Sequence, residues 1–356
     1  MTPVYFFLAL VVAGSLVTNS LLLKFVRSLG TKNQAEKVQI RWSQQTKPAI
    51  GGISFFIFFL CSVVAAILIG EVGNISRSVL AGLVGSGCLA FAAGLFDDSY
   101  NTKPLTKLAA QIACGLILVF SGVVLSLTGI GMLDKVITVL WVVGMMNSLN
   151  MLDNMDGVSA FCALIIFIWL GISFSSLGGG VNVLTIVCFG MAATLAGFLF
   201  FNWHPSKLFM GDSGSLLIGN LLAAMSVVLM MKGQTLDFSG PSTISQLVMI
   251  GTAFIAPLSD TVTVTINRLL VGRSPALGGR DHTTHHLSYL GLKDGVIALI
   301  YGILTAFGCA FAYGSFFELH AIDFFSKRMA LAYIALVFLT LFIISRINLK
   351  RKKFTY

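Results

Sequence analysis

The stretch GVSAFCALIIFIWLGISFSSLGGGVNVLTIVCFGMAATLAGFLFF, residues 157–201, contains no Asp, Glu, Lys or Arg and decides the fold class. Two long apolar segments, 157–177 and 181–201, are separated there by a short break. A helix of about 20 apolar residues is long enough to cross the hydrocarbon core of a bilayer. We therefore predict two consecutive membrane-spanning helices in this stretch.

The whole chain has the composition of a membrane protein. Of its 356 residues, 56% are hydrophobic and 10% are charged, and the mean hydropathy is +0.92. Soluble domains carry roughly 45–50% apolar and about 25% charged residues, so this composition excludes a soluble fold. The six cysteines all fall in apolar segments without a CxxC pair, which argues against a disulfide or zinc framework. We predict a single integral membrane domain over residues 1–356.

Similar apolar runs recur from end to end and predict an all-α, polytopic membrane helical bundle. Eleven spans are expected, at residues 3–23, 50–70, 78–96, 106–126, 133–149, 157–177, 181–201, 214–231, 244–266, 295–316 and 329–347. An odd number of spans places the two termini on opposite sides of the membrane.

Basic residues indicate the orientation. Of the 23 Lys and Arg residues, 18 fall in one set of predicted loops and 5 in the other. Because Lys and Arg concentrate in cytoplasmic loops, we predict an N-terminus outside and a cytoplasmic C-terminus. The net charge of +9 then reflects topology and attraction to anionic lipid head groups, and we expect no nucleic-acid partner.

Acidic residues cluster only on the predicted cytoplasmic side. Asp97 and Asp98 are adjacent in GLFDDSYNTKPLTKL, close to Lys107. Two neighbouring carboxylates at a membrane edge require a cation or basic groups nearby. The alternative interpretation is a solvated helix end.

A second polar stretch, NSLNMLDNMDGVSA, follows the fifth predicted span. It places Asn147, Asn150, Asp153 and Asp156 at steps of three. On a helix this spacing brings side chains near one another on one face. Amides and carboxylates in one stripe suit a hard cation or a sugar nucleotide, and a solvated face is the alternative.

A third motif, FMGDSGS, begins a predicted helix. Asp212 lies between Gly211 and Gly214, which permit close backbone approach. The first N–H groups of a helix can hold a phosphate, so Asp212 is expected at an anion site. A helix N-cap is the alternative role for Asp212.

The fourth stretch, GRSPALGGRDHTTHH, is rich in basic and imidazole groups. Its candidate residues are Arg273, Arg280, His282, His285 and His286. Histidines at i, i+3 and i+4 share a helical face and could bind zinc or phosphate. The arginines favour phosphate, since they repel a divalent metal and bind phosphate oxygens in pairs.

Together these loops suit a substrate that carries a diphosphate. Mg²⁺ prefers carboxylates combined with substrate phosphates and neutralises oxygens during phosphoryl transfer. Burial in a membrane implies that one reactant is a lipid.

At these residues the chain resembles the polyprenyl-phosphate N-acetylhexosamine-1-phosphate transferase family. The matching motifs are KPAIGG at 47–52, FDD at 96–98, NxxDxxDG at 150–157, FMGDSGS at 209–215, and GRSP followed by histidines. The resemblance implies transfer of HexNAc-1-phosphate, GlcNAc-1-phosphate in the first place, from a UDP-N-acetylhexosamine to undecaprenyl phosphate, with release of UMP. It implies an active site on the cytoplasmic face of the cell (inner) membrane, contact with membrane lipid, Mg²⁺ as cofactor with Mn²⁺ as a substitute, and a homodimer as one option for assembly.

The resemblance also implies roles for individual residues. Asp212 resembles the principal Mg²⁺ ligand, assisted by Asn150 and Asp98. The carboxylates of Asp97, Asp98 and Asp153 would be catalytic, with Asp97 as the residue that deprotonates the lipid phosphate. Asp156 and Phe209 resemble the positions that contact and stack on uracil. The remaining substrate contacts would come from Asn150, Lys47, Lys107, Arg273, Arg280, His282, His285 and His286.

Two departures from the family pattern bear on substrate choice. The histidine motif is HTTHH instead of HxHH or HHH, and the first loop reads RWSQQTKPAIGG instead of RKxHxxPxPxxGG. The GRSP…RDH arrangement favours the GlcNAc type, with the phospho-MurNAc-pentapeptide transferase branch as the alternative. A secondary transporter is the alternative from another class, although transporter sites lie near the bilayer midplane. An intramembrane aspartyl or zinc protease is a third interpretation.

Overall fold

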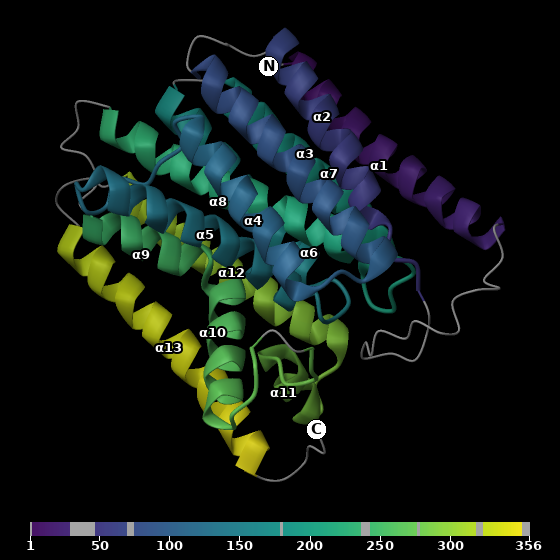
Figure 1. Cartoon of the computed structure of the whole chain (residues 1–356), viewed down its shortest axis with the longest axis vertical. Coiled ribbons are helices and arrows are strands. Elements are labelled where there is room, and N and C mark those ends of the chain that lie inside the picture. Colours follow the sequence, from purple (N-terminus) through teal and green to yellow (C-terminus); the bar gives the residue numbers. More distant parts are fainter. Residues whose placement is uncertain are drawn as a thin grey trace.

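The structure is a computed structural model that describes residues 2–28, 47–69, 75–178, 181–235, 243–275, 278–317 and 323–350. Within these ranges the chain is helical, and its extended pairing is limited to one isolated bridge between Ala49 and Phe209. The helices are α1 Thr2–Ser28, α2 Gly51–Ile69, α3 Arg77–Tyr100, α4 Pro104–Phe120, α5 Gly131–Leu152, α6 Val158–Gly178, α7 Val183–Asn202, α8 Gly211–Thr235, α9 Thr243–Ala253, α10 Ile255–Leu270, α11 Thr283–Tyr289, α12 Asp294–Phe316 and α13 Asp323–Lys350. The predicted all-α membrane bundle is confirmed (Figure 1).

Each of the eleven predicted spans overlaps a helix of the structure. Within the described ranges, nine helices are long and apolar enough to cross a membrane, or ten if a bent pair counts as one span. The predicted count of eleven and the placement of the termini stay predictions.

The fourth predicted span, 106–126, was drawn too long, because α4 ends at Phe120. Gly122 adopts a left-handed φ of +91°, which stops the helix although apolar residues continue. The following residues, Val123 and Leu125, are buried without being helical. The Thr138 side chain accepts a hydrogen bond from the Leu125 N–H at 2.9 Å and thereby satisfies this non-helical backbone.

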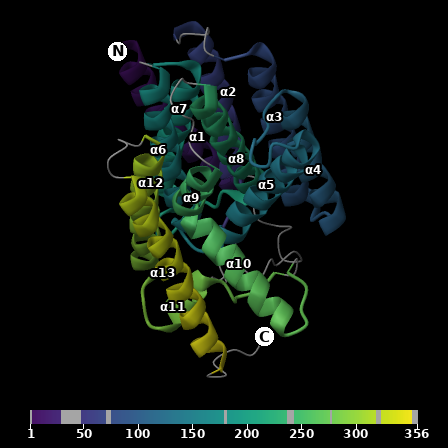
Figure 2. The same ribbon diagram turned by 90° about the vertical axis from the view of Figure 1, so that its left-hand side faces the viewer.

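The ninth predicted span, 244–266, is not continuous. Helices α9 and α10 meet at Phe254 and are bent by 84° relative to each other. Pro257 lies in the first turn of α10 and has no N–H to donate to the Ala253 carbonyl, so a straight helix cannot run through this point. The bend turns α10 away from the main bundle. Outside the main bundle, α10 lies together with α11 and the end of α13 (Figures 1 and 2).

Helix α8 occupies the centre of the bundle. In the most apolar 18-residue stretch of α8, 94% is buried, whereas in the corresponding stretches of α1 and α13 only 17% and 22% is buried. Helices α2, α3, α5 and α6 pack directly against α8. At Gly94 of α3, an added Cβ would lie 2.4 Å from the Asp212 carbonyl oxygen, so glycine is required for this approach. The close packing of α3 on α8 brings the end of one helix to the start of the other.

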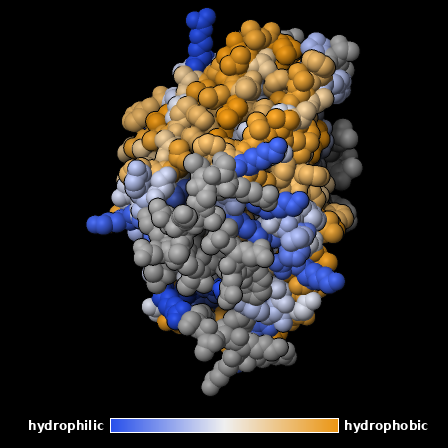
Figure 3. Space-filling model, turned by 90° about the vertical axis from the view of Figure 1, so that its right-hand side faces the viewer, coloured by the Kyte–Doolittle hydropathy of each residue, from blue (hydrophilic) through white to orange (hydrophobic). Residues whose placement is uncertain are grey.

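The surface divides into apolar and polar parts. Figure 3 shows hydrophobic residues over the upper part of one side of the molecule and hydrophilic residues gathered below them. Large apolar side chains on the outside, such as Phe6 and Phe120, are 68% and 84% exposed. Such exposure is costly in water and expected in lipid.

Candidate active site

The site begins at the turn between α3 and α4. Asn101 ends α3 in a left-handed conformation with φ 49°, and its N–H donates to the Asp97 carbonyl at 2.8 Å. Pro104 begins α4, where a proline costs no helical hydrogen bond. This short turn reverses the chain so that Lys107 on α4 comes back beside Asp97 on α3.

The ammonium of Lys107 is the centre of the cluster. It donates to Asp97 Oδ2 at 3.1 Å, to Asp212 Oδ2 at 2.7 Å and to Asn150 Oδ1 at 3.4 Å. The Lys107, Asp97 and Asp212 side chains are 18%, 11% and 15% exposed, so the ion pairs are shielded but not sealed. Four helices, α3, α4, α5 and α8, each contribute one member. We call these four residues, Asp97, Lys107, Asn150 and Asp212, the Lys107 cluster.

Thr102, outside the cluster, and Asn150, within it, fix the two acidic members of this cluster. Thr102 donates to Asp97 Oδ1 through its N–H at 2.8 Å and through its hydroxyl at 2.5 Å. Asn150 Nδ2 donates to Asp212 Oδ1 at 2.6 Å and to the Ser215 hydroxyl at 2.9 Å. Thr102 and Ser215 were not predicted as site residues, although both lie within quoted motifs.

Asp98 caps the start of α8. Its two carboxylate oxygens accept hydrogen bonds from the N–H groups of Asp212 at 2.8 Å and Ser213 at 2.9 Å. Gly211, with φ +73°, allows this approach, since a Cβ there would lie 2.7 Å from Asp98 Oδ2. Asp98 therefore holds the start of α8, and its predicted role as a metal ligand or catalytic residue stays a prediction.

A second cluster surrounds Asp156. Its carboxylate accepts from the Ser206 N–H at 3.0 Å and from the Ser206 hydroxyl at 2.7 Å. Lys47 donates to the same hydroxyl at 2.9 Å, and its ammonium lies 5.3 Å from the centre of the Phe209 ring. His204 Nδ1 lies 3.1 Å from the Asp156 carboxylate.

Backbone hydrogen bonds join the segments that carry this second cluster. The Phe209 N–H donates to the Pro48 carbonyl at 3.0 Å, and the Gly51 N–H donates to the Phe209 carbonyl at 3.0 Å. The KPAIGG and FMGDSGS motifs thus lie side by side, which puts Lys47 next to Phe209. The residues 41–46 of the first-loop motif lie outside the described part of the chain.

A third cluster holds residues 281–286, here called the histidine segment, against α10. The bidentate pair of this cluster joins Arg268 and Asp281, with nitrogen to oxygen distances of 2.8 and 2.6 Å. Asp260 accepts from the Thr283 N–H at 2.8 Å, and His282 Nδ1 lies 2.8 Å from the same carboxylate.

The three histidines are buried beside these pairs. His282 precedes α11, and its ring centre lies 5.5 Å from that of His285. Burial lowers the pKa of His285 to about 3 and that of His286 to about 4, so both imidazoles are neutral near pH 7. Burial raises the pKa of Asp281, but the hydrogen bonds and charge of Arg268 outweigh it and leave this pKa below its usual range.

The other predicted residues are placed less tightly. Asp153 is the C-cap residue of α5, three residues beyond Asn150. Arg273 and Arg280 are exposed on the segment between α10 and α11. Thr284 of α11 donates to Asn154 at 2.5 Å, which connects the histidine segment to the turn that carries Asp153 and Asp156. Their roles as catalytic or substrate-binding residues stay predictions.

The oxygen atoms of the Lys107 cluster fit a hard cation. Two carboxylates and one amide oxygen already converge on a single positive charge, the ammonium of Lys107. Mg²⁺ is commonly bound by one or two carboxylates together with substrate phosphates. Among the described residues, no group of three or more His, Cys, Asp or Glu side chains could hold a metal ion, which gives the zinc alternative for the histidines no support.

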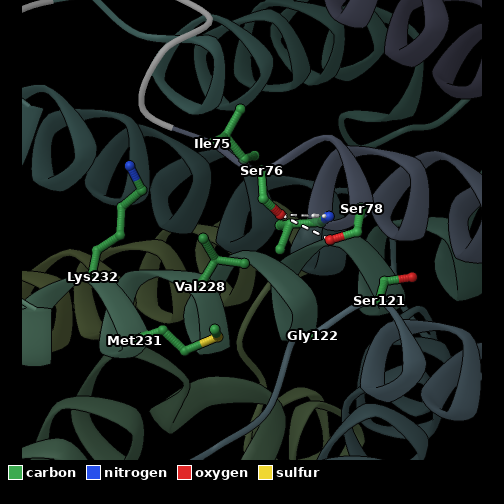
Figure 4. Close-up of a pocket in the computed structure, with 9 residues that line it drawn as sticks. Ile75, Ser76, Ser78, Ser121, Gly122, Val228, Met231 and Lys232 are labelled. Atoms are coloured by element: carbon green, nitrogen blue, oxygen red, sulfur yellow. Dashed lines mark hydrogen bonds between the residues drawn. The ribbon is translucent and has the colours of Figure 1, made fainter.

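A separate cavity of about 300 Å³ lies between the start of α3 and the end of α8 (Figure 4). Its lining includes Ser76 and Ser78 at the start of α3 and Val228, Met231 and Lys232 near the end of α8. The Lys107 cluster, in contrast, lies at the end of α3 and the start of α8. The cavity is therefore no part of the candidate active site.

The chain was compared with known proteins, and the matched region contains the Lys107 cluster. Residues 80–230, which include the Lys107 cluster, match the model of glycosyl transferase family 4. A decaprenyl-phosphate N-acetylglucosaminephosphotransferase of Mycolicibacterium smegmatis is 31% identical, over 75% of this chain and 72% of the relative. The chain belongs to this transferase family. The predicted resemblance to polyprenyl-phosphate N-acetylhexosamine-1-phosphate transferases is thereby confirmed.

Two further relatives carry the names of the two predicted branches, the GlcNAc type and the phospho-MurNAc-pentapeptide type. A probable undecaprenyl-phosphate N-acetylglucosaminyl 1-phosphate transferase of Bacillus subtilis is 28% identical, over 71% of this chain and 69% of the relative. A phospho-N-acetylmuramoyl-pentapeptide-transferase of Staphylococcus carnosus is 26% identical, over 84% of this chain and 93% of the relative. Since these relatives are transferases, the transporter alternative has no support.

Proposed function

We propose that this chain transfers GlcNAc-1-phosphate from UDP-GlcNAc to undecaprenyl phosphate and releases UMP. An oxygen of the lipid phosphate forms a bond to the phosphorus that carries the sugar, and the bond from that phosphorus to the UMP oxygen breaks. The observation that carries the proposal is the Lys107 cluster, where three charged side chains and one amide from four helices converge at one end of an apolar bundle. A cationic and anionic site at the end of membrane helices suits a charged donor and a lipid acceptor.

Most of the proposed chemistry is positioning and charge stabilisation. Bound Mg²⁺ would neutralise the diphosphate oxygens, and Asp212 and Asn150 would hold it. Lys107 supplies a positive charge beside them, and Thr102 fixes Asp97 next to Lys107. Asp98 accepts hydrogen bonds from the N–H groups of Asp212 and Ser213 and so fixes the start of α8, which carries Asp212.

A general base is a secondary requirement in this reaction. A phosphate monoester has a second pKa of about 6, so the acceptor is already largely dianionic near neutral pH. Asp97 accepts hydrogen bonds from Thr102 and Lys107, an arrangement that orients its carboxylate. We propose that Asp97 mainly positions the acceptor through Lys107 and that proton removal contributes less.

The Asp156 cluster supports binding of the nucleoside. Phe209 offers an aromatic face, and Lys47 lies over that ring. Ser206 fixes both oxygens of Asp156. We propose that uracil stacks on Phe209 and that Asp156 and its partners contact the edge of the base.

The sugar is proposed from the histidine segment and the relatives. The chain carries the GRSP…RDH arrangement, which favours the GlcNAc branch, and the Bacillus and Mycolicibacterium relatives are named for GlcNAc. The pentapeptide branch is the second candidate because the Staphylococcus relative aligns over more of both chains. Assembly as a homodimer, a cell (inner) membrane location and a cytoplasmic active site belong to the same proposal.

The test is a reconstitution with defined substrates. Purified protein is incubated with undecaprenyl phosphate, Mg²⁺ and either UDP-GlcNAc or UDP-MurNAc-pentapeptide, and UMP release is measured. We expect release only with UDP-GlcNAc, loss of activity with EDTA, and recovery with Mg²⁺ or Mn²⁺. Release with the pentapeptide donor alone would move the chain to the other branch. Uptake of a solute by proteoliposomes without UMP release would refute the transferase proposal.

A further inference from the structure

The ammonium of Lys107 lies where the oxygen atoms suited to a divalent cation converge. It is within 3.4 Å of oxygens from Asp97, Asp212 and Asn150, the first two being carboxylate oxygens. These oxygens come from three different helices, whereas Lys107 is on a fourth. A single lysine is thus the shared cationic partner of the whole cluster.

The side chain of Lys107 is suited to an exchangeable contact. An ammonium is a compact point charge on a flexible stem, and none of its three contacts here is bidentate. The Lys107 side chain is also 18% exposed, so it is not sealed inside the protein. Moving it requires only rotations of its own stem, because no backbone group of α4 takes part in the contacts.

We infer that Lys107 and the divalent cation of the reaction compete for the same oxygen atoms, so that Lys107 keeps metal affinity low until a diphosphate binds. This inference rests on the proposed function, because the diphosphate is that of the nucleotide donor. If the Lys107 ammonium and the divalent cation both lay against the oxygens of Asp97 and Asp212, the two cations would repel each other at short distance. The diphosphate gives the displaced ammonium a new anionic partner.

The consequence is coupling between metal and donor binding. If a diphosphate draws Lys107 away from Asp212, the metal binds more tightly in its presence, and by reciprocity the diphosphate binds more tightly with metal. Lys107 therefore acts as a positioning residue whose partner changes during binding.

The chain provides a matched control for this idea. Lys103 lies one turn before Lys107, at the N-cap of α4, and its side chain is exposed. Lys103→Met removes the same charge from the same helix without removing an ammonium from the Asp97 and Asp212 oxygens. Lys107→Met removes that ammonium and keeps a side chain of similar length.

The experiment measures Mn²⁺ binding by electron paramagnetic resonance on the purified full chain, without lipid acceptor and without turnover. We expect Lys107→Met to bind Mn²⁺ about tenfold more tightly than wild type, and Lys103→Met to bind like wild type. Adding UDP, with the Mn²⁺ that UDP itself binds subtracted, should raise the affinity of wild type and change that of Lys107→Met little. Equal Mn²⁺ affinity in Lys107→Met and wild type would overturn the inference.

Two further measurements keep the test decisive if Lys107→Met folds poorly. Lys107→Arg retains a cation and should keep the low Mn²⁺ affinity of wild type. Wild type alone must also show the UDP effect, and its absence overturns the inference without any variant. Wild type that binds Mn²⁺ with this coupling but releases no UMP refutes the proposed reaction and supports the inference, so the two failures are distinguishable.

Discussion

The Lys107 cluster and the Arg268–Asp281 pair are both shielded ion pairs near the same polar region, but they hold their cation differently. Arg268 binds both oxygens of Asp281 and also donates to the Pro275 carbonyl at 2.7 Å, so its donors are fixed in one plane. Lys107 shares one ammonium among three partners and is more exposed, at 18% against 6%. A bidentate pair with a backbone contact fixes a loop, whereas a shared point charge can change partners. We therefore expect the first to control stability and the second to control binding.

The largest expected effect is on the Arg268 side of this comparison. Arg268→Met leaves Asp281 as an unpaired, mostly buried charge and should lower the free energy of unfolding by about 3–5 kcal/mol. Thermal unfolding in detergent measures it. Arg273→Met, on the same segment but exposed, is the control and should change stability by about 0.5 kcal/mol or less. Equal effects of the two variants would show that the pair does not hold the loop.

The next effect is on the Lys107 side and concerns activity. Asp212→Asn keeps the shape of the side chain but removes the charge, so UMP release should fall at least about 100-fold. The melting temperature should change much less than in Arg268→Met. The control is Asp134→Asn. Asp134 lies in the first turn of α5, at the end away from Asn150, and its carboxylate accepts hydrogen bonds from Thr128. UMP release should persist in this variant. Full turnover by Asp212→Asn would remove Asp212 from the proposed metal site.

A pH series probes the histidines packed beside the Arg268 pair. Their pKa values in the folded protein, about 3 for His285 and about 4 for His286, lie below the unfolded value of about 6.5. The unfolded state therefore binds more protons below that pH, and the free energy of unfolding falls as pH drops from about 6.5, levelling off below the folded values. At pH 5 we expect a loss on the order of 1–2 kcal/mol per histidine.

The check is the unfolding midpoint at pH 7.5, 6.5 and 5 for wild type and His286→Gln. The variant lacks one titrating group, so its midpoint should fall less steeply with acid. Parallel curves for the two proteins would mean that His286 takes up its proton without unfolding.

The smallest effect tests how Asp97 is held against Lys107. Thr102→Val removes one hydrogen bond to the carboxylate and leaves the bond from the Thr102 N–H. With about 1–1.5 kcal/mol lost, kcat/KM for UMP release should fall roughly 5- to 10-fold. Thr106→Val, exposed one turn further on, should leave kcat/KM unchanged. A similar loss in both variants would indicate a general effect on α4.

Local sequence signals explain part of the site's geometry. The turn that pairs Asp97 with Lys107 follows from Asn101 and Pro104, a left-handed residue and a helix-starting residue within four positions. The start of α8 follows from Gly211, whose positive φ ends the preceding extended segment. Such signals are readable because they depend on the backbone preferences of single residues.

The separate roles of adjacent residues were not readable in this way. Asp97 and Asp98 are consecutive, so on a helix they point about 100° apart, and one faces Lys107 while the other faces the start of α8. The contact between His204 and Asp156 could not be read either, because the two residues lie 48 positions apart in the chain. Which neighbour each carboxylate meets depends on how helices pack, and not on its own segment.

By itself, the sequence determined that this chain is a helical membrane protein with its acidic motifs at helix ends, because long uncharged apolar runs have only one stable backbone arrangement in lipid. The tertiary structure decided that α9 and α10 bend at Phe254 and that one lysine serves the oxygens of three other helices. Both depend on contacts between segments far apart in the chain, whose energies are set by packing and by the geometry of charges brought together from different helices.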